Sequence, residues 1–194
     1  MHGIRMTPFR ADLRPADALL IVDVQPDFCP SGALPIPRGD AVIPVINELI
    51  DAAVAAAIPI YASRDWHPAH HLSFRKHGGP WPPHCVQDTP GAAMHPLLRL
   101  PPSAFVITKG SRLDIDQYSA FDQTGAAKHM RDRGVTRVWV AGLALDVCVK
   151  ATVLDARKEG FDVNVLAAGC RPVTPEGGEQ AKADMVAAGA AWVE

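Results

Sequence analysis

The chain has 194 residues, 48% hydrophobic and 21% charged, a composition typical of one globular domain with a full-sized core. Its net charge of −2 gives no electrostatic reason to expect a nucleic-acid partner. No segment reaches the ~20 apolar residues of a membrane span, and the N-terminal residues lack the apolar core of a signal peptide. We therefore expect a single domain over residues 1–194, with residues 1–17 as a lead-in, in a cytoplasmic protein without membrane or nucleic-acid partners.

The first half of the chain combines apolar strands, one helix and a long loop. Residues 18–24 form a continuous apolar run, as expected of a strand buried on both faces. Apolar residues at helical spacing predict a helix over residues 40–57, with Asp40 as its N-cap. Residues 59–63 predict a second strand. Residues 64–102 are rich in Pro, His and Gly, and a loop of this length is usually functional.

The second half continues the alternation of strands and helices. Further strands are predicted over residues 105–108, 137–141, 161–167 and 190–193. Further helices are predicted over residues 123–133, 146–158 and 175–188. This order predicts a three-layer α/β/α fold with a mostly parallel central sheet.

Chemically useful side chains follow the predicted strands. Asp23 lies near the end of the first strand, Asp65 and Lys109 follow the second and third, and residues 142–148 follow the fourth. Ligands of open parallel sheets bind beyond the carboxyl ends of the strands. The sequence therefore predicts that these residues share one rim.

Three of these residues suggest nucleophilic catalysis. Cys148 lies in the first turn of a predicted helix, where the positive helix end favours a thiolate and backbone N–H groups can bind an oxyanion. Asp23 is a candidate general base, and Lys109 can pair with it. The alternatives are a buried apolar cysteine, a structural aspartate and a surface lysine. The cysteines are scattered without a CxxC pair and are expected to be free thiols: Cys29, Cys85, Cys148 and Cys170.

The long loop suggests a metal site. Six of the eight histidines lie between His67 and His95. Asp65 and His67 are two residues apart and point the same way in an extended segment, and His84 can complete a set of two histidines and one carboxylate. His71 is a spare candidate ligand or a side chain that contacts one of the ligands. The alternative is a set of polar loop histidines without a metal.

Aromatic side chains are sparse, but several lie in or beside these loops. Together they can wall a pocket for a flat ring, and the alternative is ordinary loop packing. The candidates are Phe28, Trp66, Trp81 and Tyr118.

Six ordered blocks resemble the nicotinamidase/pyrazinamidase branch of the isochorismatase-like cysteine hydrolases, and the resemblance covers residues 18–194. The blocks are Val-Asp-Val-Gln-Pro-Asp-Phe (22–28), Arg-Asp-Trp-His-Pro (64–68), Trp-Pro-Pro-His-Cys-Val (81–86), Thr-Lys-Gly (108–110), Tyr-Ser-Ala-Phe (118–121) and Gly-Leu-Ala-Leu-Asp-Val-Cys-Val (142–149). The resemblance implies the isochorismatase-like hydrolase fold.

The resemblance also implies roles for individual residues. The catalytic triad is Asp23, Lys109 and Cys148. One divalent metal ion, with zinc preferred over iron or manganese, is held by Asp65, His67 and His84. A cis peptide bond at Ala144–Leu145 aims the backbone N–H groups of Leu145 and Cys148 at the substrate oxygen. Family members often carry Thr where this chain has Leu145. The positions that contact the substrate ring are Phe28, Trp81 and Tyr118.

The implied activity is hydrolysis of nicotinamide, and of pyrazinamide, to the acid and ammonia through a cysteine thioester in NAD salvage. The implied assembly is a homo-oligomer. The first alternative is a related amidohydrolase acting on a carbamoyl or ureido amide. A non-catalytic binding protein and a redox thiol protein are further alternatives.

Overall fold

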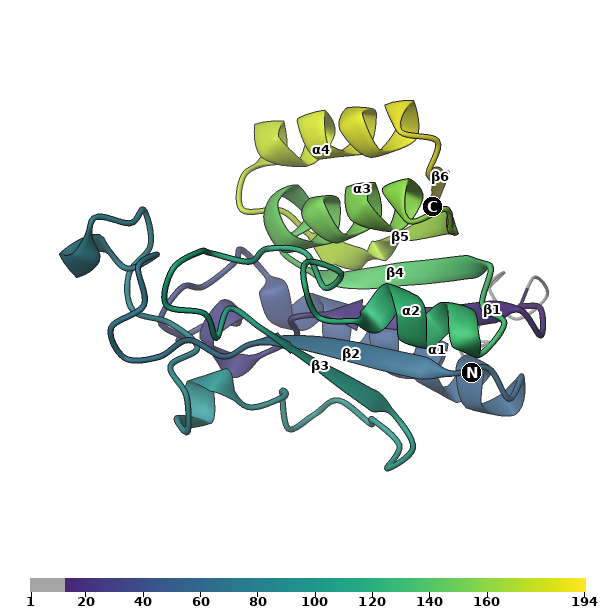
Figure 1. Ribbon diagram of the computed structural model, residues 1–194, viewed down its shortest axis with the longest axis horizontal. Coiled ribbons are helices and arrows are strands. Elements are labelled where there is room, and N and C mark those ends of the chain that lie inside the picture. The colour runs from purple at the N-terminus through teal and green to yellow at the C-terminus, as the bar shows by residue number, and fades with distance from the viewer. Residues whose placement is uncertain (1–12) are drawn as a thin grey trace, which may run out of the picture.

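A computed structural model describes residues 13–194, so most of the expected lead-in lies outside the described residues. Its centre is a six-stranded sheet in the order β3-β2-β1-β4-β5-β6 (Figure 1), and every neighbouring pair is parallel. The strands are β1 (Asp17–Val22), β2 (Ile60–Asp65), β3 (Phe105–Lys109), β4 (Arg137–Leu143), β5 (Asp162–Arg171) and β6 (Ala191–Val193). The predicted parallel sheet is confirmed.

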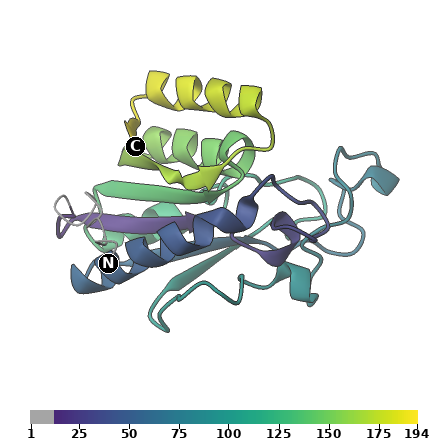
Figure 2. The same ribbon diagram turned by 180° about the vertical axis from the view of Figure 1, so that it is seen from behind.

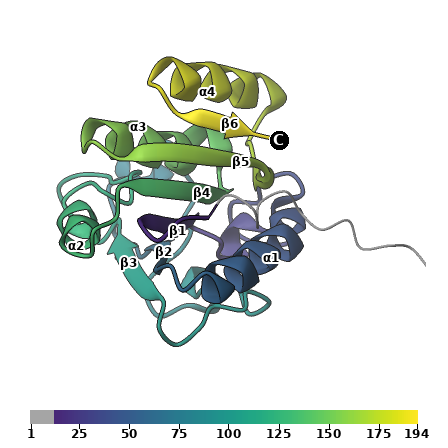
Figure 3. The same ribbon diagram turned by 90° about the vertical axis from the view of Figure 1, so that its right-hand side faces the viewer.

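Helices cover both faces of this sheet and complete the three layers. Helix α1 (Val42–Ala55) lies across one face (Figure 2), while α2 (Ala126–Asp132) and α3 (Lys150–Lys158) lie on the other, with α4 (Pro175–Ala187) packed beside α3 (Figure 3). Short turns of other types complete the elements: η2 (Pro26–Phe28), η3 (Gly39–Ala41), η4 (Arg75–His77), η5 (Pro90–Ala92) and the π-helical turn η6 (Leu145–Val149).

The apolar run of β1 forms the middle of both cores. Leu19 and Ile21 pack in the core beneath α1, while Leu20 and Val22 pack in the core beneath α2 and α3. All four are at most 1% exposed. Successive strand residues point to opposite faces, so a strand covered on both sides must be apolar throughout.

Several predicted boundaries are wrong in informative ways. Asp40 does not cap α1; it lies inside η3, and the N-cap Ala41 makes no side-chain cap hydrogen bond. Strand β4 runs two residues further than predicted. It continues through Gly142, which has a φ of 138° and where a Cβ would lie 2.1 Å from the oxygen of Val22. Only glycine permits this close approach of two strands.

The segment between β2 and β3 has little regular structure, as predicted. Apart from η4 and η5 it runs as turns and bridges, and it extends from the sheet at the carboxyl ends of the strands (Figure 1). The described cysteines are all free and buried. Within residues 13–194, no helix has the length and apolar character needed to cross a membrane.

Candidate active site

A buried lysine joins the three residues expected to carry the chemistry. The Nζ atom of Lys109, at the end of β3, lies 2.7 Å from Oδ2 of Asp23 and 3.6 Å from Sγ of Cys148. The same Nζ lies 2.5 Å from Oδ1 of Asp65. Lys109 and Asp23 are 0% exposed, and Cys148 is 5% exposed. The prediction that these residues meet at one rim of the sheet is confirmed.

Burial sets the protonation of the acid and the thiol. Burial raises the pKa of Asp23, against the opposing effect of Lys109. Burial also raises the pKa of Cys148, again against Lys109, so the thiol is its resting form. The thiolate expected from the helix end is therefore not the resting state, and Cys148 needs a base. Ser63 orients the candidate base, because its Oγ donates a 2.6 Å hydrogen bond to Oδ1 of Asp23.

The three expected metal ligands converge. One donor atom from each of Asp65, His67 and His84 lies within 4.8 Å of the others, and all three residues are buried. Nδ1 of His67 lies 2.8 Å from the oxygen of Gly110, and Nδ1 of His84 lies 2.8 Å from the oxygen of Pro82. These contacts orient each ring and leave its Nε2 atom as the metal ligand. Burial lowers the pKa of His84 and favours the neutral imidazole that a metal requires. The donor set fits a divalent transition metal.

His71, the spare candidate, lies beside this trio. Its ring stacks on His67 with centroids 4.3 Å apart, and its Nδ1 lies 2.7 Å from Oγ of Ser73. His67, His71 and Asp116 also form a group with ligand atoms within 4.8 Å of one another. His71 is therefore adjacent to the expected site, and its part in it is open.

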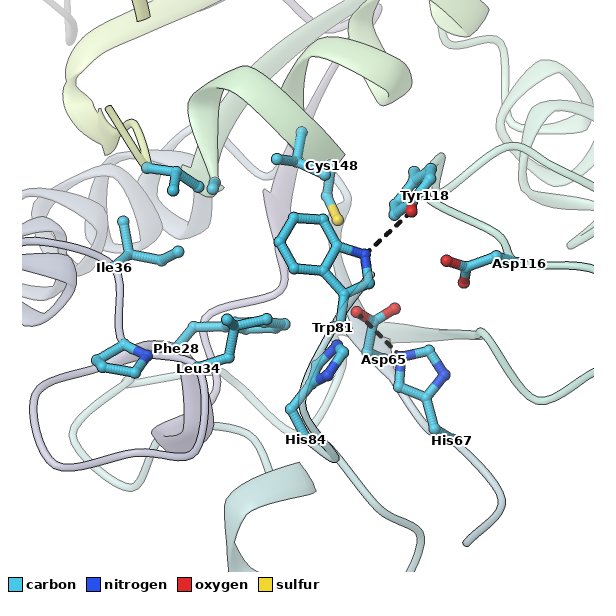
Figure 4. Close-up of a pocket in the computed structure, with 14 residues that line it drawn as sticks. Phe28, Leu34, Ile36, Asp65, His67, Trp81, His84, Asp116, Tyr118 and Cys148 are labelled. Atoms are coloured by element: carbon cyan, nitrogen blue, oxygen red, sulfur yellow. Dashed lines mark hydrogen bonds and ion pairs between the residues drawn. The ribbon is translucent and has the colours of Figure 1, made fainter. Parts of the chain in front are cut away.

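A pocket lies between the nucleophile and the trio (Figure 4). Three expected aromatic residues line it, and Nε1 of Trp81 donates a 3.0 Å hydrogen bond to the hydroxyl of Tyr118. Trp66 does not line the pocket, since its ring packs 4.0 Å from the guanidinium of Arg64. The lining residues are Phe28, Leu34, Pro35, Ile36, Asp65, His67, Trp81, His84, Asp116, Tyr118, Ala144, Val147, Cys148 and Val173.

The turn before the nucleophile differs from expectation by one residue. The cis peptide bond joins Leu143 to Ala144, and the prediction of Ala144–Leu145 is wrong. The reason is the longer β4, which reaches Leu143 and moves the start of the turn. Ala144 lines the pocket together with Cys148, whereas Leu145 lines a separate groove together with Cys170.

Two aspartates that the sequence did not single out hold the loops of the site. Oδ2 of Asp27 accepts the N–H of Cys85 at 2.7 Å, and its Oδ1 accepts the N–H of Ala33. Oδ1 of Asp146 accepts the N–H of Val173 at 2.8 Å. Both aspartates lie in the blocks that carry the resemblance, but no sequence spacing indicates which distant N–H each one meets.

Known proteins are similar to this chain in sequence and fold. The isochorismatase domain model matches residues 17–194. A nicotinamidase of Escherichia coli (strain K12) is 42% identical over 199 residues, covering 91% of this chain and 93% of the relative. A pyrazinamidase of Pyrococcus horikoshii in complex with zinc is 46% identical with a TM-score of 0.90, and the match covers 93% of this chain and 99% of that one.

A second solved structure extends the likeness to a liganded protein. PnC1 from L. infantum, in complex with nicotinate, is 39% identical with a TM-score of 0.86, and the match covers 93% of each chain. The family model spans nearly all the residues that form the sheet, the pocket and the converging side chains described above. The chain therefore belongs to the isochorismatase family.

Proposed function

We propose that the chain is a nicotinamidase, which hydrolyses nicotinamide to nicotinate and ammonia and also accepts pyrazinamide. The observation that supports this proposal is one pocket lined by Cys148 and by a carboxylate–imidazole trio, with the buried pair of Lys109 and Asp23 next to the thiol. The first set suits cleavage of a carboxamide, and the second suits a metal that binds a ring nitrogen. Relatives named nicotinamidase support the same activity.

The mechanism follows from the buried set around Lys109. Asp23 accepts the proton of the Cys148 thiol, and the positive charge of Lys109 stabilises the thiolate. The sulfur attacks the amide carbon, and Asp23 delivers the proton to the nitrogen as ammonia leaves. Water then adds to the thioester with Asp23 as base, which releases the acid and restores the thiol.

Backbone N–H groups would stabilise the oxyanion of each tetrahedral intermediate. We assign this role to Ala144 and Cys148, in place of the pair Leu145 and Cys148 expected from the resemblance. The support is that Ala144 and Cys148 line the pocket, while Leu145 lines a separate groove.

The carboxylate–imidazole trio would hold a divalent cation, with zinc first and iron or manganese as alternatives. When bound, such a cation would supply a Lewis acid for the ring nitrogen of the substrate. Asp65 joins the two halves of the site, since it is a ligand candidate and also an ion-pair partner of Lys109. The aromatic walls from Phe28, Trp81 and Tyr118 would hold the ring between them.

We propose that the protein acts in NAD salvage in the cytoplasm. We also propose that the chain forms one functional domain. The homo-oligomer expected from the resemblance stays a prediction, which light scattering of the purified protein would check.

Ammonia release from nicotinamide tests the proposed activity. Purified protein should turn the amide over, and Cys148→Ala should show no turnover above the blank. Cys170→Ala is a matched control, because Cys170 is also a buried cysteine but lines a separate groove and not the pocket. Equal turnover by wild type and Cys148→Ala would contradict the mechanism.

A further inference from the structure

One buried amide outside the triad and the trio contacts the backbone of the residue that joins them. Gln25 is 0% exposed. Its Nε2 donates hydrogen bonds to the oxygens of Asp65 and Ala92, each at 2.8 Å. Its Oε1 accepts the N–H of Asp65, also at 2.8 Å. The side chain thus satisfies both backbone groups of Asp65.

The course of β1 explains why Asp65 needs this contact. The register of β1 with β2 ends at the pair Val22 and Ser63, because the chain turns away at Asp23, whose φ is 49°. Within residues 13–194, the register with β1 gives Asp65 no main-chain partner on that side, although Asp65 still pairs with Lys109 of β3 on the other side. A side-chain amide offers a donor and an acceptor as a peptide group does. Gln25 therefore replaces the missing strand and extends β2 to Asp65.

The same amide also ties Asp65 to the loop that supports another ligand. Through Ala92, Gln25 holds the segment η5, in which Gly91 packs so closely on Asp27 that a Cβ there would lie 2.2 Å from Oδ1. Asp27 in turn fixes the N–H of Cys85, next to His84. Two of the three expected ligands are thus held through the turn that follows β1.

We propose that Gln25 is a positioning residue for the metal site: by fixing the backbone of Asp65 it keeps that carboxylate beside His67 and His84. This inference rests on the proposed metal site. Residues that orient metal ligands typically change metal affinity by about 10–100-fold when they are replaced. The loss of Gln25 should therefore weaken metal binding by a factor in this range.

A second buried amide in the chain provides a matched control. Nδ2 of Asn47 donates to the oxygen of Leu97 at 2.9 Å, and its Oδ1 accepts the N–H of Arg99 at 2.8 Å. Asn47 is 7% exposed and lies in α1, and none of the bonds of its side-chain amide goes to an expected ligand. It makes the same kind of two-sided contact with a backbone segment, but away from the pocket.

The experiment compares Gln25→Met with Asn47→Leu, which are neutral changes of similar size. Each protein is stripped of metal with a chelator, its zinc affinity is measured by competition with a chromophoric chelator, and its Tm is recorded with and without zinc. Both variants should lower the Tm of the stripped protein. Only Gln25→Met should weaken zinc binding, by about 10–100-fold, and reduce the rise in Tm that zinc produces.

The possible results separate the inference from the proposed site. Zinc affinity within about twofold of wild type for Gln25→Met, or an equal loss for Asn47→Leu, would overturn the positioning role. If wild type itself binds no zinc, iron or manganese, the proposed metal site is wrong and the inference falls with it. If Gln25→Met does not fold, Gln25→Asn is judged by the same criterion, because its amide is one methylene too short to reach all three partners.

Discussion

Replacing Lys109 with Met tests the electrostatic centre of the site. The Nζ atom is fully buried and neutralises two carboxylates, Asp23 at 2.7 Å and Asp65 at 2.5 Å. Burial raises the pKa of Asp65, but Lys109 and His67 together overcome this effect and the net shift is downward. Lys109→Met removes the compensating charge and leaves both carboxylates inside the protein.

The expected loss of stability is large. Removing one partner of a buried ion pair typically costs about 3–5 kcal/mol, because the remaining charge is uncompensated. For a domain of this size, 1 kcal/mol corresponds to about 2–4 °C in Tm, so the Tm should fall by about 6–20 °C. The loss should shrink as the pH is lowered from 7 to 5. Without Lys109 the folded-state pKa of Asp65 should rise above its unfolded value, and that of Asp23, already raised by burial, should rise further, so proton uptake stabilises the folded variant.

Urea unfolding of the metal-free protein at pH 7 and pH 5 measures this difference. The control is Lys128→Met, which removes the exposed ion pair between Lys128 and Asp132 and should leave the unfolding free energy nearly unchanged. A Lys109→Met protein within about 1 kcal/mol of wild type at pH 7 would refute the argument. A deficit that grows toward pH 5 would refute it as well.

The remaining predictions concern the base Asp23, the metal, and Asp27, which holds the loops of the site. Asp23→Asn should keep the fold but lower kcat about 10²–10⁴-fold, measured by ammonia release; a smaller effect would exclude Asp23 as the base. In wild type, kcat/KM should fall with decreasing pH as Asp23 is protonated. Because burial raises the pKa of Asp23, this fall should occur at a higher pH than the ~3.9 at which an ordinary aspartate titrates. Chelation should lower both turnover and Tm, and zinc at about 100 times its Kd should restore about 2.7 kcal/mol of stability; an unchanged Tm would argue against a bound metal. Asp27→Asn removes one acceptor for the N–H groups of Cys85 and Ala33, which Asp27 holds in the loops of the site. In steady-state kinetics this variant should raise KM for nicotinamide more than it lowers kcat. A change in kcat alone would contradict this role of Asp27.

Much of the fold follows from the sequence, because the hydrophobic pattern of each segment and the order of strands and helices determine it. The apolar run of β1 predicts a strand buried on both faces, and the alternation of elements predicts a parallel sheet. In such a sheet the carboxyl ends of the strands meet at one rim, so Asp23, Asp65 and Lys109 are brought together by topology alone. Their meeting with Cys148 is predictable for the same reason.

Other features depend on contacts that spacing does not encode. The place of the cis bond depends on how far β4 continues through Gly142. The raised pKa of Cys148 depends on burial, which outweighs the opposing charge of Lys109. The reach of Gln25 and Asp27 across about 40 and 58 positions is set by loop paths. For such side chains the sequence indicates a polar residue near the site, but not its partner.

The most direct test of the central claim is to identify the covalent intermediate. Wild-type protein is mixed with nicotinamide, quenched in acid during turnover, digested and analysed by mass spectrometry. We predict one nicotinoyl group on the peptide that contains Cys148, and none on the peptides that contain Cys29, Cys85 or Cys170. Steady ammonia release without acylation of Cys148, or continued release by the Cys148→Ala protein, would contradict it.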